Sequence, residues 1–246
     1  MTSVLSTTPT TRSMGRPIPL FVIAGVLLLR TGLLFAVGGL ALRTSGARAG
    51  EVMSFVNLWI VPVDLISIYV VWWLLRRSGR SLGDLTGRFQ GRDVAWGLLV
   101  LVIGMIALQG GGFLGNLIAF GGPPPVDNSL PAPPVWLGLW SLLLIPITIA
   151  VAEELVYRGF GQKGLQSAIG RWPAMLVVAA FFGLQHAALS MTSGEMMLSR
   201  VIGTFIAGVA FGIMAMRFRT LWPLIIGHWL LDVLGLGLPM LMWSLS

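Results

Sequence analysis

The chain contains no cysteine, and only 10% of its 246 residues are charged. Without cysteine, disulfides and thiolate metal sites are excluded. A soluble domain carries about 25% charged residues, whereas 56% of this chain is hydrophobic and its mean hydropathy is +0.88. The composition excludes an ordinary soluble protein and predicts an integral membrane protein that crosses the bilayer several times.

The net charge of +7 does not indicate a nucleic-acid-binding surface. The arginines lie in short loops beside apolar segments, which is the pattern of membrane topology signals. We therefore expect the lipid bilayer as a partner and no nucleic acid.

Seven apolar stretches have close to the roughly 20 residues that a transmembrane helix needs. They run at about 18–42, 52–75, 93–119, 136–157, 172–190, 199–216 and 221–243. The expected fold class is an all-α polytopic transmembrane bundle of about seven spans. An eighth span stays open, because Gly235, Gly237 and Pro239 could break the last stretch.

The chain divides into four expected regions. A Ser/Thr-rich cytoplasmic tail, expected to be disordered, covers residues 1–17, and N-terminal transmembrane helices cover 18–119. A proline-rich external loop over 120–135 is followed by a transmembrane core over 136–246.

Arginine placement predicts the orientation in the membrane. The 76–92 loop carries five arginines and the 120–135 loop carries no Lys or Arg, so the first is expected inside and the second outside. This places the N-terminus in the cytoplasm of a bacterial cell, with the protein in the cell membrane. Arg43 and Arg48, in the first external loop, argue weakly against this orientation.

Several ionisable residues interrupt the apolar stretches. Each costs roughly 2.5–3.5 kcal/mol at the centre of a spanning helix, so each is expected to face the protein interior or a cavity. Arg30 lies in the middle of the first stretch, and Asp64 is a clear mid-span acid in the second.

The pair Glu153-Glu154 stands at the end of the fourth stretch. Glu154 and Arg158 are four residues apart and share one helix face, which predicts a bidentate ion pair. Glu153 points about 100° away and has no cation nearby in sequence, as would suit a general base. The alternative is that both glutamates are ion-paired packing residues.

The two histidines of the chain lie in later apolar stretches. His186 follows Phe182 by one turn, and His228 precedes Asp232 by one turn. A single histidine in an apolar helix is usually a hydrogen-bonded core residue, but three helices with ionisable groups at this spacing favour an active site.

These motifs resemble the CAAX prenyl protease and bacteriocin-processing (CPBP) intramembrane endopeptidases, also called type II CAAX or abortive-infection-like proteins. The family pattern is Glu-Glu-x-x-x-Arg, then Phe-x-x-x-His, then His-x-x-x-Asn/Asp. Here it consists of Glu153, Glu154, Arg158, Phe182, His186, His228 and Asp232, and the resemblance covers roughly residues 136–235.

The resemblance implies an intramembrane endopeptidase that hydrolyses a peptide bond of a membrane-associated protein or peptide. Glu153 and His186 would activate water, and His228 would stabilise the oxyanion. Asp232 stands where other members have Asn, and would orient His228 or keep it charged. Glu154 and Arg158 would hold the helix end in place, with Phe182 as support.

Two alternatives stay open beside this reading. A non-catalytic bacteriocin-immunity or scaffold protein could keep the same fold, and an ion-coupled transporter could use buried acids and histidines. No cofactor is expected, although a divalent metal such as zinc could be held by Glu153, His186 and His228. Sequence does not identify the substrate, its prenylation or the oligomeric state.

The expected helix boundaries create a geometric conflict. With 1.5 Å per residue, Glu153 and His228 would lie roughly 6–10 Å from the cytoplasmic edge, and His186 about 21 Å from it. The groups can meet only if the fifth helix is tilted or if a deep cavity opens to the cytoplasm.

Overall fold

The computed structural model describes residues 18–246. The predicted tail over 1–17 lies outside the described residues. The helical elements, in chain order, are α1 (Leu20–Thr44), α2 (Ala49–Val56), η1 (Asn57–Trp59), α3 (Ile60–Arg77), α4 (Leu82–Thr86), α5 (Arg92–Phe120), α6 (Val135–Leu143), α7 (Ile145–Glu153), η2 (Glu154–Gln162), α8 (Lys163–Ile169), α9 (Arg171–Ala187), α10 (Gly194–Ala215), α11 (Trp222–Asp232), η3 (Val233–Gly237) and α12 (Leu238–Ser244).

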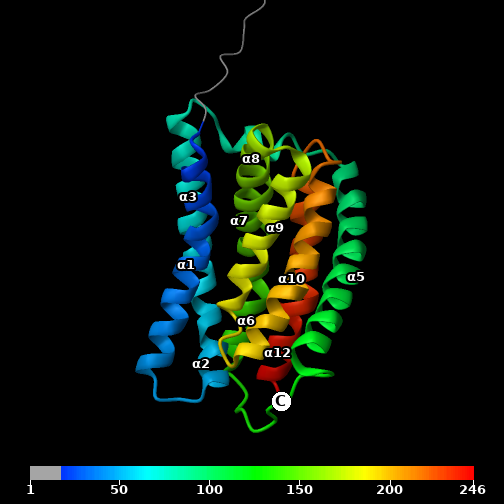
Figure 1. Cartoon of the computed structure of the whole chain (residues 1–246). Helices are drawn as coiled ribbons and strands as arrows, with labels where there is room; N and C mark the ends of the chain where they lie inside the picture. The colour runs from blue at the N-terminus through cyan, green and yellow to red at the C-terminus, as the bar shows by residue number, and fades with distance from the viewer. Residues whose placement is uncertain (1–17) are drawn as a thin grey trace, which may run out of the picture.

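The described chain is an all-α bundle of roughly parallel and antiparallel helices (Figure 1). Six helical segments within it are long and apolar enough to cross a membrane. The helix α9, with 17 residues, runs beside them and packs on α1 and α10. The expected all-α transmembrane fold is confirmed, with a span count close to the expected seven.

Three of the spanning segments change helical type part-way. The second joins α2 to α3 through the 3₁₀ turn η1, and the fourth and last contain the π-helical stretches η2 and η3. Prolines follow two of these changes, Pro62 after η1 and Pro239 after η3. A proline lacks a backbone N–H and is tolerated in a first helical turn, where that group has no intrahelical acceptor.

The fourth span is longer than the sequence predicted. It covers Val135–Ile169, with a turn at Leu144 between α6 and α7, whereas the expected end was residue 157. Arg158 and Lys163 lie beyond that expected end. Arg158 is buried, and the Lys163 ammonium donates to the Leu85 carbonyl at 3.0 Å, so both charges are accommodated within the helix.

The proline-rich segment between α5 and α6 packs on the turn before α2. Arg48 Nη1 donates to Ser129 Oγ at 2.6 Å and lies 3.8 Å from Asp127 Oδ2, and Arg48 also pairs with Glu51 at 2.7 Å. Arg48, whose charge argued weakly against an external position for this turn, is therefore paired with two carboxylates.

Two buried hydrophobic clusters stand one above the other in the bundle. One includes Leu27 of α1 and Tyr157, and the other includes Leu34 of α1 and Ile149. Arg30 lies between them on α1 and is fully buried. The two clusters thus enclose a polar layer that contains the candidate site.

Candidate active site

A change of helical type places the two adjacent glutamates. Glu153 is the last residue of α7, and Glu154 is the first of the π-helical segment η2. Wider π turns are rare and occur often at functional sites. Both carboxylates are buried, and both face the same imidazole, that of His228.

The two nitrogens of His228 have different neighbours. Nδ1 lies 2.8 Å from Glu154 Oε1 in hydrogen-bond geometry, while Nε2 lies 3.6 Å from both Glu153 Oε2 and Asp232 Oδ2. The hydrogen bond of this ring is made with Glu154, while Asp232 lies within ion-pair distance of Nε2. Glu154 holds the ring because π-helical η2 turns its carboxylate toward α11, and Asp232 faces the opposite ring edge.

Arg158 is buried beneath two aromatic rings. Its guanidinium carbon lies 4.3 Å from the centroid of Phe182 and 5.3 Å from that of Phe211. Nη1 is 3.3 Å from Glu154 Oε1, and no side-chain nitrogen of Arg158 makes a hydrogen bond within residues 18–246. The expected bidentate pair is therefore replaced by one ion-pair contact, while ring faces supply much of the remaining attraction for the charge.

Glu153 has a cation partner that the sequence reading did not provide. Arg30 Nη1 donates to Glu153 Oε1 at 2.6 Å, and Arg30 Nε donates to Asp64 Oδ1 at 2.8 Å. Arg30 comes from α1 and Asp64 from α3, so the absence of a cation near Glu153 in the sequence was misleading. One guanidinium bridges two buried carboxylates.

Gln185 completes this polar layer from α9. Its amide Nε2 donates to Glu153 Oε1 at 2.9 Å, and its Oε1 accepts from both Arg30 Nη1 and, at 2.7 Å, the hydroxyl of Tyr157. In each contact the amide nitrogen donates and the amide oxygen accepts, as their chemistry requires. The Glu153 side chain is consequently fixed by two donors on one oxygen.

The other oxygen of Glu153 is buried without a hydrogen-bond partner among the described residues, and so is Oδ2 of Asp232. Both oxygens face Nε2 of His228. A buried polar atom without a partner costs roughly 1–3 kcal/mol. Two such atoms around one imidazole mark a position suited to a water molecule or a substrate group.

His186 is fixed by its own helix. Nδ1 lies 2.7 Å from the Phe182 carbonyl oxygen. Because a carbonyl can only accept, Nδ1 carries the proton in this contact and Nε2 keeps its lone pair. The imidazole can therefore accept a hydrogen bond through Nε2.

A cavity of about 310 Å³ connects these groups. Its lining includes Glu153, His186, His228 and Asp232, together with Phe182. The structure thus brings every predicted catalytic acid and histidine except Glu154 to one cavity. Glu154 does not line the cavity but contacts Nδ1 of His228.

Glu153 and His186 lie at similar depth in the bundle because the fourth helix is longer than expected. At 1.5 Å per residue, Glu153 lies about 24 Å from Ile169 and His186 about 22 Å from Arg171, the adjoining ends of two neighbouring helices. Both groups therefore stand in the middle of the bundle. The earlier placement of Glu153 near the inner edge was wrong because it ended the helix at residue 157.

The cavity extends from the site toward the end of the bundle that contains α2. Gly50 and Met53 of α2, Thr192 after α9 and Met240 of α12 line it. In Figure 1 this end lies opposite the start of α1 and the short helix α8. Among the described residues, the cavity therefore does not extend toward the end of the bundle where α1 begins.

The residues proposed for a metal do not fit one in this geometry. In residues 18–246, no three His, Asp or Glu side chains are arranged to hold a metal ion. We therefore derive no step through a metal.

Sequence reasoning missed the partners of Glu153. Arg30 and Asp64 were each visible as charges inside apolar stretches, and their opposite signs were the available signal. Gln185 and Tyr157 lie inside the motifs, next to His186 and one residue before Arg158, but neither residue type is unusual in a buried helix.

Replacing Arg30 by Met is expected to destabilise the protein strongly. The change leaves Asp64 and Glu153 buried without their shared cation, and breaking a buried ion pair on one side costs about 3–5 kcal/mol. Thermal unfolding of purified protein measures this, with Arg43→Met, at an exposed arginine of the same helix, as the control. Equal unfolding temperatures for the two variants would contradict the role assigned to Arg30.

Comparison with known proteins places the site within a family. Residues 134–234 match the family model described as type II CAAX prenyl endopeptidase Rce1-like. That segment includes both glutamates and both histidines, but not Arg30 or Asp64. No curated protein and no solved structure was found that matches the chain. The chain is thus an integral membrane protein that carries an Rce1-like domain over residues 134–234, and this match supports the resemblance to the CAAX protease (CPBP) family.

Proposed function

We propose that the protein is an intramembrane endopeptidase that hydrolyses a peptide bond of a membrane-associated protein or peptide. The observation that carries the proposal is the asymmetry of Glu153. One of its oxygens accepts from Arg30 and Gln185, whereas the other lies 3.6 Å from His228 Nε2 without a hydrogen-bond partner among residues 18–246, and Glu153 lines the cavity. A general base needs this combination of fixed orientation and one available oxygen.

In the proposed first step, Glu153 Oε2 takes a proton from a water molecule as the water oxygen attacks the scissile carbonyl carbon. His186 Nε2 accepts the second hydrogen of that water and so orients it, since Nδ1 is committed to the Phe182 carbonyl. The carbonyl π electrons move to oxygen and form a tetrahedral oxyanion.

His228 would stabilise that oxyanion. In the imidazolium form both ring nitrogens donate, so Nδ1–H can stay on Glu154 while Nε2–H points to the oxyanion. Donors of this kind contribute about 2.7–4 kcal/mol in other hydrolases. Collapse of the intermediate breaks the C–N bond, and Glu153 returns its proton to the leaving amine.

The role of Glu154 and Arg158 in this scheme is to position His228. Arg158 lies against Glu154 on one side and against Phe182 on the other, and Phe182 also contacts the rings of Tyr157 and His186. The motif residues therefore form one continuous contact from α9 to α11.

We also propose that the N-terminus is cytoplasmic, as the arginines of the α3–α5 loop indicate. The cavity would then open toward the external side. A cavity that opens to the cytoplasm, one of the two arrangements expected from the sequence, is not part of this proposal.

Glu153→Gln is expected to abolish cleavage, with a rate loss of about 10²–10⁴-fold, because the amide cannot take the proton. The measurement compares membrane and secreted peptides from cells with wild-type protein, Glu153→Gln and the exposed control Glu195→Gln at equal abundance. Peptide ends that vanish only in Glu153→Gln identify the substrate. Unchanged ends beside a surviving cellular phenotype would favour a non-catalytic scaffold or immunity protein.

Once a substrate is known, a chelator added to the purified enzyme tests the metal-free scheme. Full activity in the presence of the chelator is expected. Loss of activity that zinc restores would overturn that part of the proposal.

Asp232→Asn is expected to keep activity within about tenfold of wild type, because an amide at this position can donate to the oxyanion. His228→Asn should lose about 10²–10³-fold, the effect of removing one oxyanion donor. Single-turnover cleavage rates of the two variants provide the comparison. A larger loss in Asp232→Asn than in His228→Asn would show that the carboxylate charge is essential.

The absence of native cysteine makes the orientation directly testable, since an engineered cysteine is the sole thiol. Asn128→Cys in the proline-rich loop should react with a membrane-impermeant maleimide on intact cells, because we place that loop outside. Gly91→Cys, exposed before α5, should react only after permeabilisation. The reverse labelling would invert the proposed topology.

A further inference from the structure

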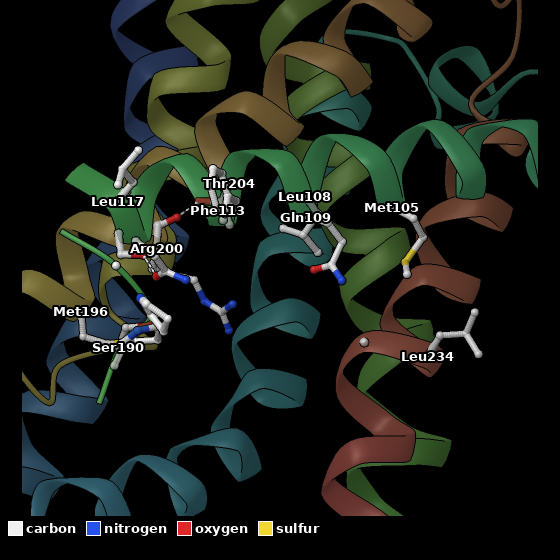
Figure 2. Close-up of a pocket in the computed structure, with 18 residues that line it drawn as sticks. Met105, Leu108, Gln109, Phe113, Leu117, Ser190, Met196, Arg200, Thr204 and Leu234 are labelled. Atoms are coloured by element: carbon white, nitrogen blue, oxygen red, sulfur yellow. Dashed lines mark hydrogen bonds between the residues drawn. The ribbon is translucent and has the colours of Figure 1, made fainter. Parts of the chain in front are cut away.

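Arg200 of α10 differs from the other two arginines near the site. Arg30 and Arg158 are buried, and each lies against a carboxylate. Arg200 is exposed, and its guanidinium makes no hydrogen bond or close ion pair with any residue in 18–246, although Asp232 attracts it from a longer distance. Figure 2 shows it extending away from its helix into open space.

That open space is a groove beside the catalytic cavity. The groove has a volume of about 890 Å³ and lies between α5, α10 and η3. Its walls are mostly apolar, with Leu108, Phe113 and Leu234 among them. Apolar walls of this kind suit an extended or helical hydrophobic segment, as a membrane-associated substrate would present.

Arg200 lines both spaces. It belongs to the groove and also to the cavity that contains Glu153, His228 and Asp232. Leu108, Thr204 and Gly235 are likewise shared, so the two spaces meet at this point. A chain that passes from the groove to the candidate catalytic groups must therefore pass the guanidinium.

A cation in this position needs an anionic partner. Arginine inside a spanning segment is costly unless it is paired or reaches water. Asp232 attracts Arg200 across the shared cavity, but neither Asp232 nor Glu153 makes an ion pair with it, so its N–H donors have no acceptor among residues 18–246. The flat guanidinium offers two parallel N–H donors, which match the two oxygens of a carboxylate.

We infer that Arg200 is a subsite for a carboxylate of the substrate peptide, either its terminal carboxyl group or an Asp or Glu side chain beside the scissile bond. This inference rests on the proposed function for its peptide ligand. The position of Arg200 at the junction, with the catalytic groups in reach of the same cavity, favours a peptide group over a lipid headgroup.

Binding tests the inference without requiring cleavage. The probes are three dansyl-labelled peptides of one apolar sequence: a free-carboxylate form, its C-terminal amide, and an amide in which one internal residue is Glu. The Glu153→Gln protein in phosphatidylcholine nanodiscs serves as the host, so that no probe is consumed. Affinities are compared with and without Arg200→Gln, and with Arg43→Gln as an exposed control.

At least one acidic probe is expected to bind about tenfold more tightly than the neutral amide, the effect of one charge-assisted contact. Arg200→Gln should remove this preference, Arg200→Lys should keep part of it, and Arg43→Gln should leave it unchanged. Equal binding of all three probes to the Arg200 protein would overturn the inference.

Two further arms separate the sources of failure. If phosphatidylglycerol nanodiscs abolish the acidic preference of the Arg200 protein and leave Arg200→Gln unaffected, the ligand is a lipid headgroup and the inference fails. With a cleaved substrate in hand, Arg200→Gln should raise KM for the acidic peptide and leave its neutral analogue unchanged. Absence of cleavage by wild type, with the acidic binding preference intact, would count against the proposed function alone.

Discussion

The buried guanidinium of Arg30 is the interaction on which the arrangement of the bundle depends. It contacts Asp64 of α3, Glu153 of α7 and Gln185 of α9, so side chains from four helices meet at one cation. A buried ion costs several kcal/mol unless its partners are well placed. The hydrophobic clusters above and below exclude water from this layer. Because water cannot replace a missing partner there, the four helices must hold their side chains close to the guanidinium. The Rce1-like segment therefore depends on two N-terminal helices outside it to orient Glu153.

The adjacent glutamates have separate contacts because the helix changes type between them. Glu153 ends an α-helix and points to Arg30, whereas Glu154 begins a π-helical stretch and holds Nδ1 of His228. The two side chains thus approach the same imidazole from different sides. A regular α-helix would separate adjacent side chains by about 100°, and the wider π turn changes which residues share a face.

The arginines of the site show three ways to hold a cation among apolar helices. Arg30 is enclosed by carboxylates and an amide, and Arg158 lies on aromatic faces beside one carboxylate. Arg200 makes neither kind of close contact, is attracted only at a distance by Asp232, and lies where two cavities meet. The first two charges are satisfied by the fold, and their function is positional. An unsatisfied third charge in an open groove is the arrangement expected of a ligand contact.

The sequence by itself determined the all-α transmembrane fold, because long apolar stretches must form helices in a bilayer. It also placed Glu154 beside Arg158, four residues away, and identified the family through motifs at short spacing. It could not supply the contact between Arg30 and Glu153, which are 123 residues apart. Only the tertiary structure decided that contact, the π-helical turn after Glu153 and the true end of the fourth helix. The physical reason is that a charged residue such as Arg158 ends an apolar stretch in the sequence, whereas in the fold aromatic rings from other helices and the carboxylate of Glu154 compensate its charge and the helix continues.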